Sequence, residues 1–267
     1  MVDATIDVIP RGTVRMDRNF HAEASTIATQ SDPNPDLELV DAAVYNLVID
    51  HPDGTILWDT GCHPEAGDGH WPGGLYDAFP AIDAHQHRLD DDLAEAGYDI
   101  GEIDYVIQSH LHMDHAGGLE FFDGTDTPIF VHEAELKYAY FSAKTGEGNA
   151  GYVLDDFDHD LNWNVIYRDN VAPFEDIEFL HLPGHTPGLL GLRVELEDAG
   201  TLIFTSDLAD SADNYERMQP MGPGLIWDRR SWFDSLRRIH DLERRTDAEV
   251  VFGHDTDQIE AVGDGWS

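Results

Sequence analysis

The stretch that decides the fold is Ser109-His110-Leu111-His112-Met113-Asp114-His115-Ala116-Gly117-Gly118. It follows the apolar run Tyr105-Val106-Ile107, which predicts a buried strand that ends in a loop. His110 and His112 are two positions apart, so their side chains leave an extended backbone on the same face. Asp114 and His115 follow where the chain must turn, and the two glycines give that turn its backbone freedom. The stretch therefore offers two imidazoles to one cation, and a carboxylate with an imidazole to a neighbouring cation.

Imidazole nitrogens and carboxylate oxygens are ligands that suit zinc and comparable transition metals. The alternative is that these are ordinary polar loop residues, which would be the better explanation for a single histidine. Four metal-competent side chains within six positions, at the end of an apolar strand, favour a metal site instead.

Three further apolar strands are each followed by a residue that can bind a metal. The alternating run Ile177–Leu182 leads into a turn bracketed by proline and glycine, and this turn displays His185. Residues 201–205 predict a strand that delivers Asp207, and residues 249–252 predict one that leads to Gly253 and His254. These residues are placed much as the main motif is.

The His-x-His-x-Asp-His motif and the three later residues resemble the metal-binding sequence of the metallo-β-lactamase superfamily. The resemblance spans nearly the whole chain, from Asp59-Thr60-Gly61 to Gly253-His254. It implies an α/β fold, a four-layer αβ/βα sandwich in which two mixed sheets pack face to face with helices outside. It also implies that Asp59 lies beneath the metal site and orients it.

The same resemblance implies a centre of two divalent metal ions, with zinc as the first expectation and iron, cobalt or manganese as alternatives. The implied ligands are His110, His112 and His185 for one ion, Asp114, His115 and His254 for the other, and Asp207 for both. Asp114 and Asp207 are the candidate catalytic residues. Two cations about 3.5–4 Å apart lower the pKa of a shared water, and the bridging hydroxide attacks a carbonyl carbon. No serine or cysteine nucleophile is needed, so we interpret Cys62 as structural.

Within the superfamily, several short sequence segments look closest to those of N-acyl-homoserine lactonases, which act in quorum quenching. These segments are Leu57–Pro64, Ile103–His112 and Val251–Asp255. The expected function is the opening of a lactone or a related ester. One position departs from the pattern, because lactonases of this type often have a tyrosine three residues after the bridging aspartate. Here that residue is Asp210.

Two other functions share these ligands. A glyoxalase II-like thioesterase has the same metal-binding residues, but it usually grips an anionic thioester with basic residues, and Lys137 and Lys144 are the only lysines. A protein that binds metal without catalysis is the alternative of another class. A redox diiron relative is disfavoured, because such proteins typically replace the second histidine of the motif with glutamate and His112 is intact.

The charge of the chain is extreme, with 15 Lys+Arg against 54 Asp+Glu and a formal net charge of −39. The phosphate backbone of a nucleic acid would be repelled by it, so we expect a small-molecule ester substrate and no nucleic-acid partner. Acidic residues are interleaved with apolar ones along the whole chain. This pattern predicts a folded, halophilic protein, because salt screens the self-repulsion.

No apolar run reaches the ~20 residues of a membrane helix, and the first residues lack the features of a secretory signal. We therefore expect a cytoplasmic protein without a membrane partner. The sequence predicts a single domain over residues 1–267, with loop insertions near 62–88, 144–172 and 209–230. An exposed apolar loop would allow a homodimer.

Secondary structure follows from periodicity and turn residues. A strand that starts at Thr5 should be broken at Pro10 and Gly12, and a hairpin should span residues 44–59. Helices are predicted over 89–97, 133–142 and 231–245. The histidines of the first insertion and the acidic run 155–160 are interpreted as solvated. Two apolar groups are candidates for a pocket wall: Trp71, Tyr76 and Phe79, and Met218, Met221, Leu225, Ile226 and Trp227.

Overall fold

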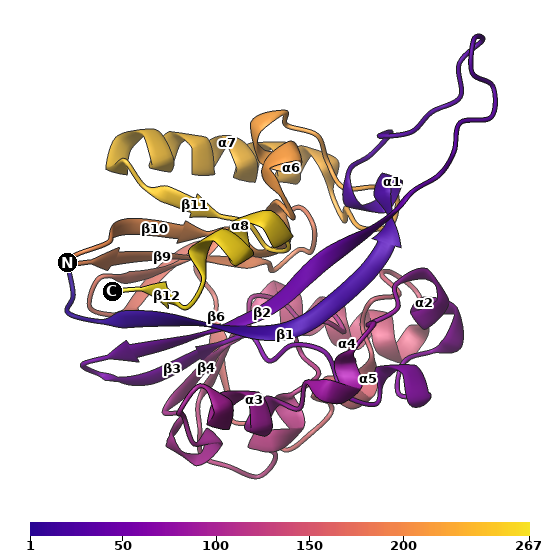
Figure 1. The fold of residues 1–267 in the computed structure, drawn as a ribbon. Coiled ribbons are helices and arrows are strands. Elements are labelled where there is room, and N and C mark those ends of the chain that lie inside the picture. Colours follow the sequence, from indigo (N-terminus) through magenta and orange to yellow (C-terminus); the bar gives the residue numbers. More distant parts are fainter.

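Two β-sheets pack face to face in this protein, and helices cover the outer face of each sheet (Figure 1). The computed structural model describes residues 1–267. The strands are β1 (Thr5–Asp17), β2 (Leu39–His51), β3 (Gly54–Trp58), β4 (Tyr105–Ile107), β5 (Ile129–His132), β6 (Trp163–Ile166), β7 (Asn170–Phe174), β8 (Ile177–His181), β9 (Leu190–Leu196), β10 (Gly200–Phe204), β11 (Glu249–Val251) and β12 (Gly265–Trp266). The α-helices are α1 (Arg18–His21), α2 (Gly73–Ala78), α3 (Leu89–Glu95), α4 (Glu133–Thr145), α5 (Leu154–Phe157), α6 (Ala212–Glu216), α7 (Arg229–Thr246) and α8 (Thr256–Val262).

The larger sheet has the strand order β12-β1-β2-β3-β4-β5-β6, and the smaller sheet has the order β11-β10-β9-β8-β7. Strands β3 to β6 run parallel, whereas β12, β1, β2 and β3 pair antiparallel. In the smaller sheet β10 and β11 are parallel and the other pairs are antiparallel. Both sheets are therefore mixed, and the fold class predicted from the sequence is confirmed.

The layers are held together by three buried apolar clusters. Between the sheets, Ile49 of β2 and Phe179 of β8 belong to one cluster, because alternate strand residues point to the same face. Trp232 of α7 packs with residues of β8, β10 and β11 on the outer face of the smaller sheet. Leu93 of α3 and Ala139 of α4 pack on the outer face of the larger sheet. This stacking of helix, sheet, sheet and helix is the predicted four-layer sandwich.

Helix α7 shows how the sequence pattern produces this packing. Its buried residues are Trp232, Ser235, Leu236 and Ile239, a spacing that places them on one helical face. Asp228 caps the helix, and its carboxylate accepts a hydrogen bond from the Ser231 backbone N–H at 2.7 Å. The helix predicted over 231–245 is thus confirmed and begins two residues earlier.

Two predictions about local structure are corrected. Strand β1 does not end at Pro10 but continues to Asp17, because a register shift between Pro10 and Thr13 accommodates the proline without ending the strand. The predicted insertions are not plain loops. Residues 62–88 contain α2, residues 144–172 contain α5 and β6 and the start of β7, and residues 209–230 contain α6 and the start of α7.

The segment between α1 and β2 projects from the body of the sandwich (Figure 1). Ile27 and Leu37 on this segment are 63% and 70% exposed. None of the helices combines the length and the apolar character that crossing a membrane requires.

Candidate metal centre

The seven predicted ligands converge where four strands end. His110, His112, Asp114 and His115 follow β4, and His185 lies in the turn after β8. The other two ligands, Asp207 and His254, follow β10 and β11. Since β4 belongs to the larger sheet and the other three strands to the smaller one, the ligands meet where the ends of the two sheets come together.

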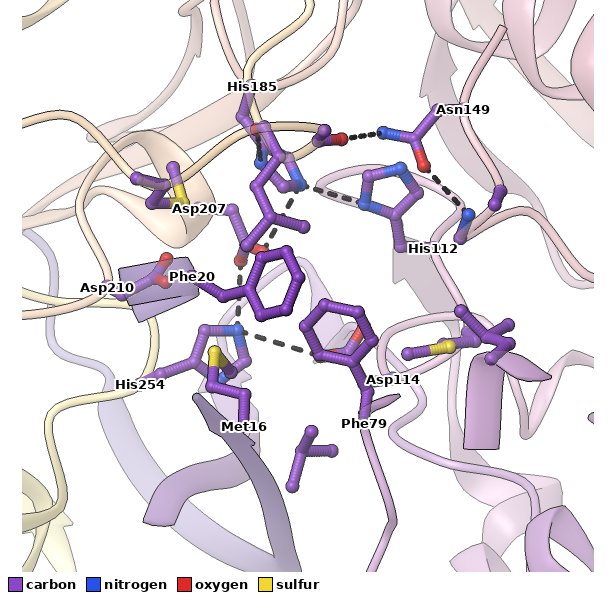
Figure 2. A pocket seen from close by; sticks show the side chains of 18 of the residues that line it. Met16, Phe20, Phe79, His112, Asp114, Asn149, His185, Asp207, Asp210 and His254 are labelled. Carbon is purple, nitrogen blue, oxygen red and sulfur yellow. Dashed lines mark hydrogen bonds and ion pairs between the residues drawn. The ribbon is translucent and has the colours of Figure 1, made fainter. Parts of the chain in front are cut away.

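The first group consists of His110, His112, His185 and Asp207, whose candidate ligand atoms all lie within 4.8 Å of one another. His112 Nδ1 is 2.8 Å from His185 Nε2, so these two ring nitrogens face the same position (Figure 2). Asp207 Oδ2 lies 3.3 Å from His185 Nε2 and 3.6 Å from His110 Nε2. Three imidazoles and one carboxylate oxygen thus surround one position.

The second group consists of Asp114, His115 and His254, again with ligand atoms within 4.8 Å. Here the other oxygen of Asp207 takes part, with Oδ1 lying 3.1 Å from His115 Nε2 and 3.2 Å from His254 Nε2. Asp114 Oδ2 lies 3.8 Å from His254 Nε2 (Figure 2). The two oxygens of one carboxylate therefore face two different groups, which is the geometry that a bridging ligand requires.

Unpartnered buried nitrogens show that the residues fit metal ions. His110 Nε2, for example, is buried and makes no hydrogen bond. A buried polar atom without a partner is costly, and a metal ion would provide the missing partner. The donor set of imidazole nitrogens and carboxylate oxygens is one that zinc, iron, cobalt and manganese accept.

The outward nitrogens of two predicted ligands are held by backbone carbonyls. His185 Nδ1 donates to the Leu225 carbonyl oxygen at 2.6 Å, and His254 Nδ1 donates to the Ala43 carbonyl oxygen at 2.8 Å. A ring nitrogen that faces a carbonyl oxygen must be the donor, so in the neutral imidazole the inward Nε2 carries the free lone pair. Both rings are thus oriented and, when neutral, are in the tautomer that binds a metal.

Asp59 lies beneath the motif, as the sequence predicts. Its carboxylate accepts hydrogen bonds from the Ser109 backbone N–H and from Ser109 Oγ, both at 2.7 Å. Its backbone has φ of 57°, in the left-handed region that non-glycine residues seldom adopt. Such strain persists only where surrounding contacts fix the residue, and it gathers at functional sites.

Glu135 of α4 is a second organising residue, and the sequence analysis missed it. The side chain is fully buried and accepts hydrogen bonds from the Leu111 backbone N–H at 3.1 Å, Tyr152 Oη at 2.8 Å and Thr186 Oγ1 at 2.6 Å. Burial raises the pKa of this carboxyl, and the hydrogen bonds act against that rise. Because Leu111 lies inside the motif and Thr186 follows His185, Glu135 ties the two ligand loops together.

Protonation differs between the two groups. Burial, followed by the neighbouring imidazoles, lowers the pKa of His110 well below its ordinary value, so this ring is neutral. Burial also lowers the pKa of His254, but nearby carboxylates outweigh this effect. The carboxylate of Asp207 contributes most to this rise, and the pKa of His254 is raised to about 10. Burial also works against the charge on Asp207, yet the surrounding imidazoles hold its pKa well below the ordinary value. Metal binding at this centre would therefore release protons.

An apolar pocket of about 320 Å³ opens onto the metal-binding groups. Its polar floor includes Asp207 and His254, and its apolar wall is formed by side chains from β1, α1, the first insertion and the loop before α7 (Figure 2). The apolar lining residues are Val14, Met16, Phe20, Leu75, Phe79, Met113, Ala150, Met221, Pro223 and Leu225. No lysine or arginine lines the pocket.

The two predicted pocket walls are confirmed in part. Phe79, Met221 and Leu225 line the pocket, whereas Trp71 is buried in the same core cluster as the lining residues Val14 and Met16 and does not itself line the pocket. Trp227 is 46% exposed and does not line it. The sequence analysis missed Val14, Met16 and Phe20, because β1 was expected to end before it reached the site.

The interpretation of the first-insertion histidines as solvated is wrong for two of them. His63 and His70 stack with ring centroids 3.6 Å apart, and His63 is buried. His70 Nε2 lies 2.5 Å from the fully buried Asp156, so that member of the acidic run 155–160 is not solvated either. The pair joins two segments that are 86 positions apart in the sequence.

The chain belongs to the metallo-beta-lactamase superfamily, because the model of that family matches residues 40–254. The matched range contains the positions of all seven predicted ligands. Membership of this superfamily, which the sequence motif indicated, is confirmed.

Within this superfamily, the chain is similar to N-acyl homoserine lactonases. The chain is 32% identical over 271 residues to the N-acyl homoserine lactonase AiiB of Agrobacterium fabrum. This alignment covers 96% of this chain and 95% of that protein. It is 30% identical over 255 residues to an N-acyl homoserine lactonase of a Bacillus species, with 94% and 92% covered. A solved N-acyl homoserine lactone hydrolase, with the product N-hexanoyl-L-homoserine at its catalytic metal centre, matches with a TM-score of 0.82 and 26% identity over 98% of this chain and 97% of that one.

Proposed function

We propose that this protein is a dinuclear metal-dependent hydrolase that opens the ring of an N-acyl homoserine lactone or a related ester. The observation that carries the proposal is the position of Asp207, whose two oxygens face two separate ligand groups at the floor of an apolar pocket. The names of the relatives support the same substrate class.

The proposed ligand roles follow from the geometry. His110, His112 and His185 would bind one ion, and Asp114, His115 and His254 would bind the other. Asp207 would bridge the two ions and, as an anion, reduce the repulsion between them. When two divalent cations are bound, they lower the pKa of a shared water and polarise a carbonyl oxygen. Zinc is the first expectation for both ions, with iron, cobalt or manganese as alternatives.

The chain itself binds and orients the substrate. The apolar wall formed by residues such as Phe20, Phe79 and Met221 would bury an acyl chain and exclude water from it. The Asn149 side chain bridges two loops beside the pocket, donating from Nδ2 to the Gly224 carbonyl oxygen at 3.0 Å and accepting at Oδ1 from the Gly151 backbone N–H at 2.7 Å. The lactone end of the substrate would lie at the polar floor of the pocket and the acyl chain against its apolar wall.

The pocket also separates the proposal from its nearest rival. A thioesterase of the glyoxalase II kind would need cationic groups for an anionic carrier, and the lining contains neither lysine nor arginine. A protein that only stores metal would not need an apolar wall that can bind an acyl chain. Both observations favour an ester or lactone with an apolar acyl chain.

Four expectations from the sequence are kept as proposals. They are the treatment of residues 1–267 as one domain, a halophilic source, a cytoplasmic location and a homodimer. The net charge of −39 supports halophily. Ile27 and Leu37, exposed on the projecting segment, support association with a second copy.

A substrate panel tests the proposed function. The metal-loaded protein is assayed at molar salt with N-hexanoyl homoserine lactone, N-decanoyl homoserine lactone, a simple acyl ester and an acyl thioester of glutathione. We expect kcat/KM for a lactone to exceed that for the thioester by at least about ten-fold, or ~1.4 kcal/mol in transition-state binding. The His112→Ala variant should lose turnover of every substrate. Preferred cleavage of the thioester would contradict the assignment, and so would the absence of any turnover.

A further inference from the structure

Asp210 lines the pocket beside the second ligand group and is not explained by the centre described so far. The residue is 2% exposed, and its Oδ1 atom makes no hydrogen bond. A carboxylate oxygen of Asp210, one of Asp207 and a ring nitrogen of His254 all lie within 4.8 Å of one another. Figure 2 shows Asp210 on the same side of the pocket as these two residues.

Backbone contacts fix this position. The His254 N–H donates to the Asp210 carbonyl oxygen at 2.9 Å, and the Gly253 N–H donates to the Ala209 carbonyl oxygen at 2.9 Å. A Cβ atom at Gly253 would lie 2.8 Å from the Ser206 carbonyl carbon, so only glycine allows the two segments to approach so closely. The main chain therefore holds Asp210 next to His254.

An unpartnered carboxyl in this place is costly. Burial without a hydrogen-bond donor disfavours a carboxylate, and the nearby Asp207 adds repulsion of like charges. No lysine or arginine lines the pocket to offset that charge. A cation at the centre is the group that would pair with it.

We propose that Asp210 is an additional ligand of the second metal ion, together with Asp114, His115, His254 and the shared Asp207. This inference rests on the proposed function, because it takes the two-ion centre as given. It extends that centre by a carboxylate at the position where lactonases of this type often have a tyrosine.

The additional ligand makes the two metal sites chemically different. The first site has three imidazoles and one carboxylate oxygen, a four-ligand set that suits tetrahedral zinc. The second would have two imidazoles and three carboxylates, a set richer in oxygen and higher in coordination number. Such a set suits harder ions with five or six ligands, such as Mn²⁺ or Fe²⁺. We therefore expect the second site to prefer these ions more than the first site does.

The test compares metal binding by the full chain and by variants. Asp210→Asn keeps the size of the side chain and removes its charge, and Asp210→Ser serves as a second variant if the amide disturbs folding. Asp213→Asn is the matched control, because Asp213 lies three residues further on and is 44% exposed. Each protein is titrated with Co²⁺ at molar salt, and both the bound metal and the visible absorption are measured.

We expect both Asp210 variants to bind the first Co²⁺ with unchanged affinity and the second at least about ten-fold more weakly. The absorption of the second Co²⁺ should become more intense, because cobalt with fewer ligands absorbs more strongly. Asp213→Asn should match the unmodified protein in both readouts.

Three results would overturn the inference. If both Asp210 variants keep the affinity and the spectrum of the second ion, Asp210 is not a ligand, even if ester hydrolysis falls. If the unmodified protein binds a third ion that the variants lose, Asp210 belongs to a separate site. If the unmodified protein binds fewer than two ions, the proposed dinuclear function fails together with the inference.

Discussion

The Asp59 carboxylate supports His115 from behind the metal centre, with Asp59 Oδ2 lying 2.8 Å from His115 Nδ1. The same carboxylate accepts both hydrogen bonds from Ser109, so it joins the start and the end of the motif. Since the outward nitrogen of His115 is held by a carboxylate, the inward Nε2 is both aimed and made more basic. One residue about fifty positions upstream therefore fixes the geometry of the main motif.

Asp59→Asn should weaken metal binding without changing the ligands themselves. The amide is a weaker acceptor than the carboxylate, so His115 loses its orientation and part of its basicity. We expect the affinity for the second ion to fall by about 10- to 100-fold, measured by competition with a chelator. Asp53→Asn, at an exposed turn position, is the control. Equal metal release by Asp59→Asn and the unmodified protein would show that Asp59 has no orienting role.

The candidate ligands could be predicted from the sequence because each one follows an apolar strand at a recognisable motif. His185 and His254 are examples, since a strand pattern ending at a glycine precedes each of them. Glu135 could not be predicted in this way. It lies in a helix, and its partners Leu111, Tyr152 and Thr186 come together only when the chain folds.

The same limit explains two wrong interpretations. His70 and Asp156 carry no local signal of pairing, because 86 positions separate them. Pro10 is a usual sign of a strand end, but a register shift lets β1 continue past it. The extension brings Val14 and Met16 to the pocket, so an error in one strand boundary hid part of the substrate wall.

The two aromatic residues of the apolar wall should make the protein selective for acyl-chain length. The rings of Phe20 and Phe79 are 4.9 Å apart, and both line the pocket (Figure 2). Phe79→Ala should raise KM for the decanoyl lactone by about ten-fold, which corresponds to ~1.4 kcal/mol of lost apolar contact. The butanoyl lactone should be affected less, because its chain reaches less of the wall. Phe141→Ala, at an exposed helix position, should change neither value. An equal rise in KM for both substrates would contradict this role of the wall.

Stability should depend on pH through His70 and Asp156. Burial lowers the pKa of His70, but the hydrogen bond and charge of Asp156 outweigh it and raise the pKa above the ordinary value of 6.5. Burial raises the pKa of Asp156 to about 6. A histidine with a raised folded pKa stabilises fully below pH 6.5, and this stabilisation is lost as pH rises through the raised value.

The thermal midpoint of the unmodified protein should therefore fall more steeply than that of His70→Asn as the pH rises above 6.5. Both proteins are measured metal-loaded at the same salt concentration, so that contributions from the metal centre cancel. His85→Asn, at an exposed position in the same insertion, should follow the unmodified protein. Parallel curves for His70→Asn and the unmodified protein would show that the pair does not set this dependence.

Salt should stabilise the fold strongly. With a net charge of −39, the folded chain repels itself, and raising salt from ~0.1 M to ~1 M shortens the Debye length from about 10 Å to about 3 Å. We expect the thermal midpoint to rise over this range in KCl. Sucrose at matched osmolality separates screening from general solute exclusion and should stabilise less. A midpoint that is the same in salt-free buffer and in molar KCl would refute the halophilic interpretation.

The most direct measurement of the central claim is proton release during hydrolysis of N-hexanoyl homoserine lactone by the zinc-loaded protein and by Asp207→Asn. The exchange keeps the shape of the side chain and removes the anion that faces both ligand groups. We predict steady ring opening by the unmodified protein and a loss of at least about a hundred-fold in kcat/KM, or ~2.7 kcal/mol, in the variant. Equal turnover by the two proteins would contradict the account, because the lactone would then be opened without the shared carboxylate.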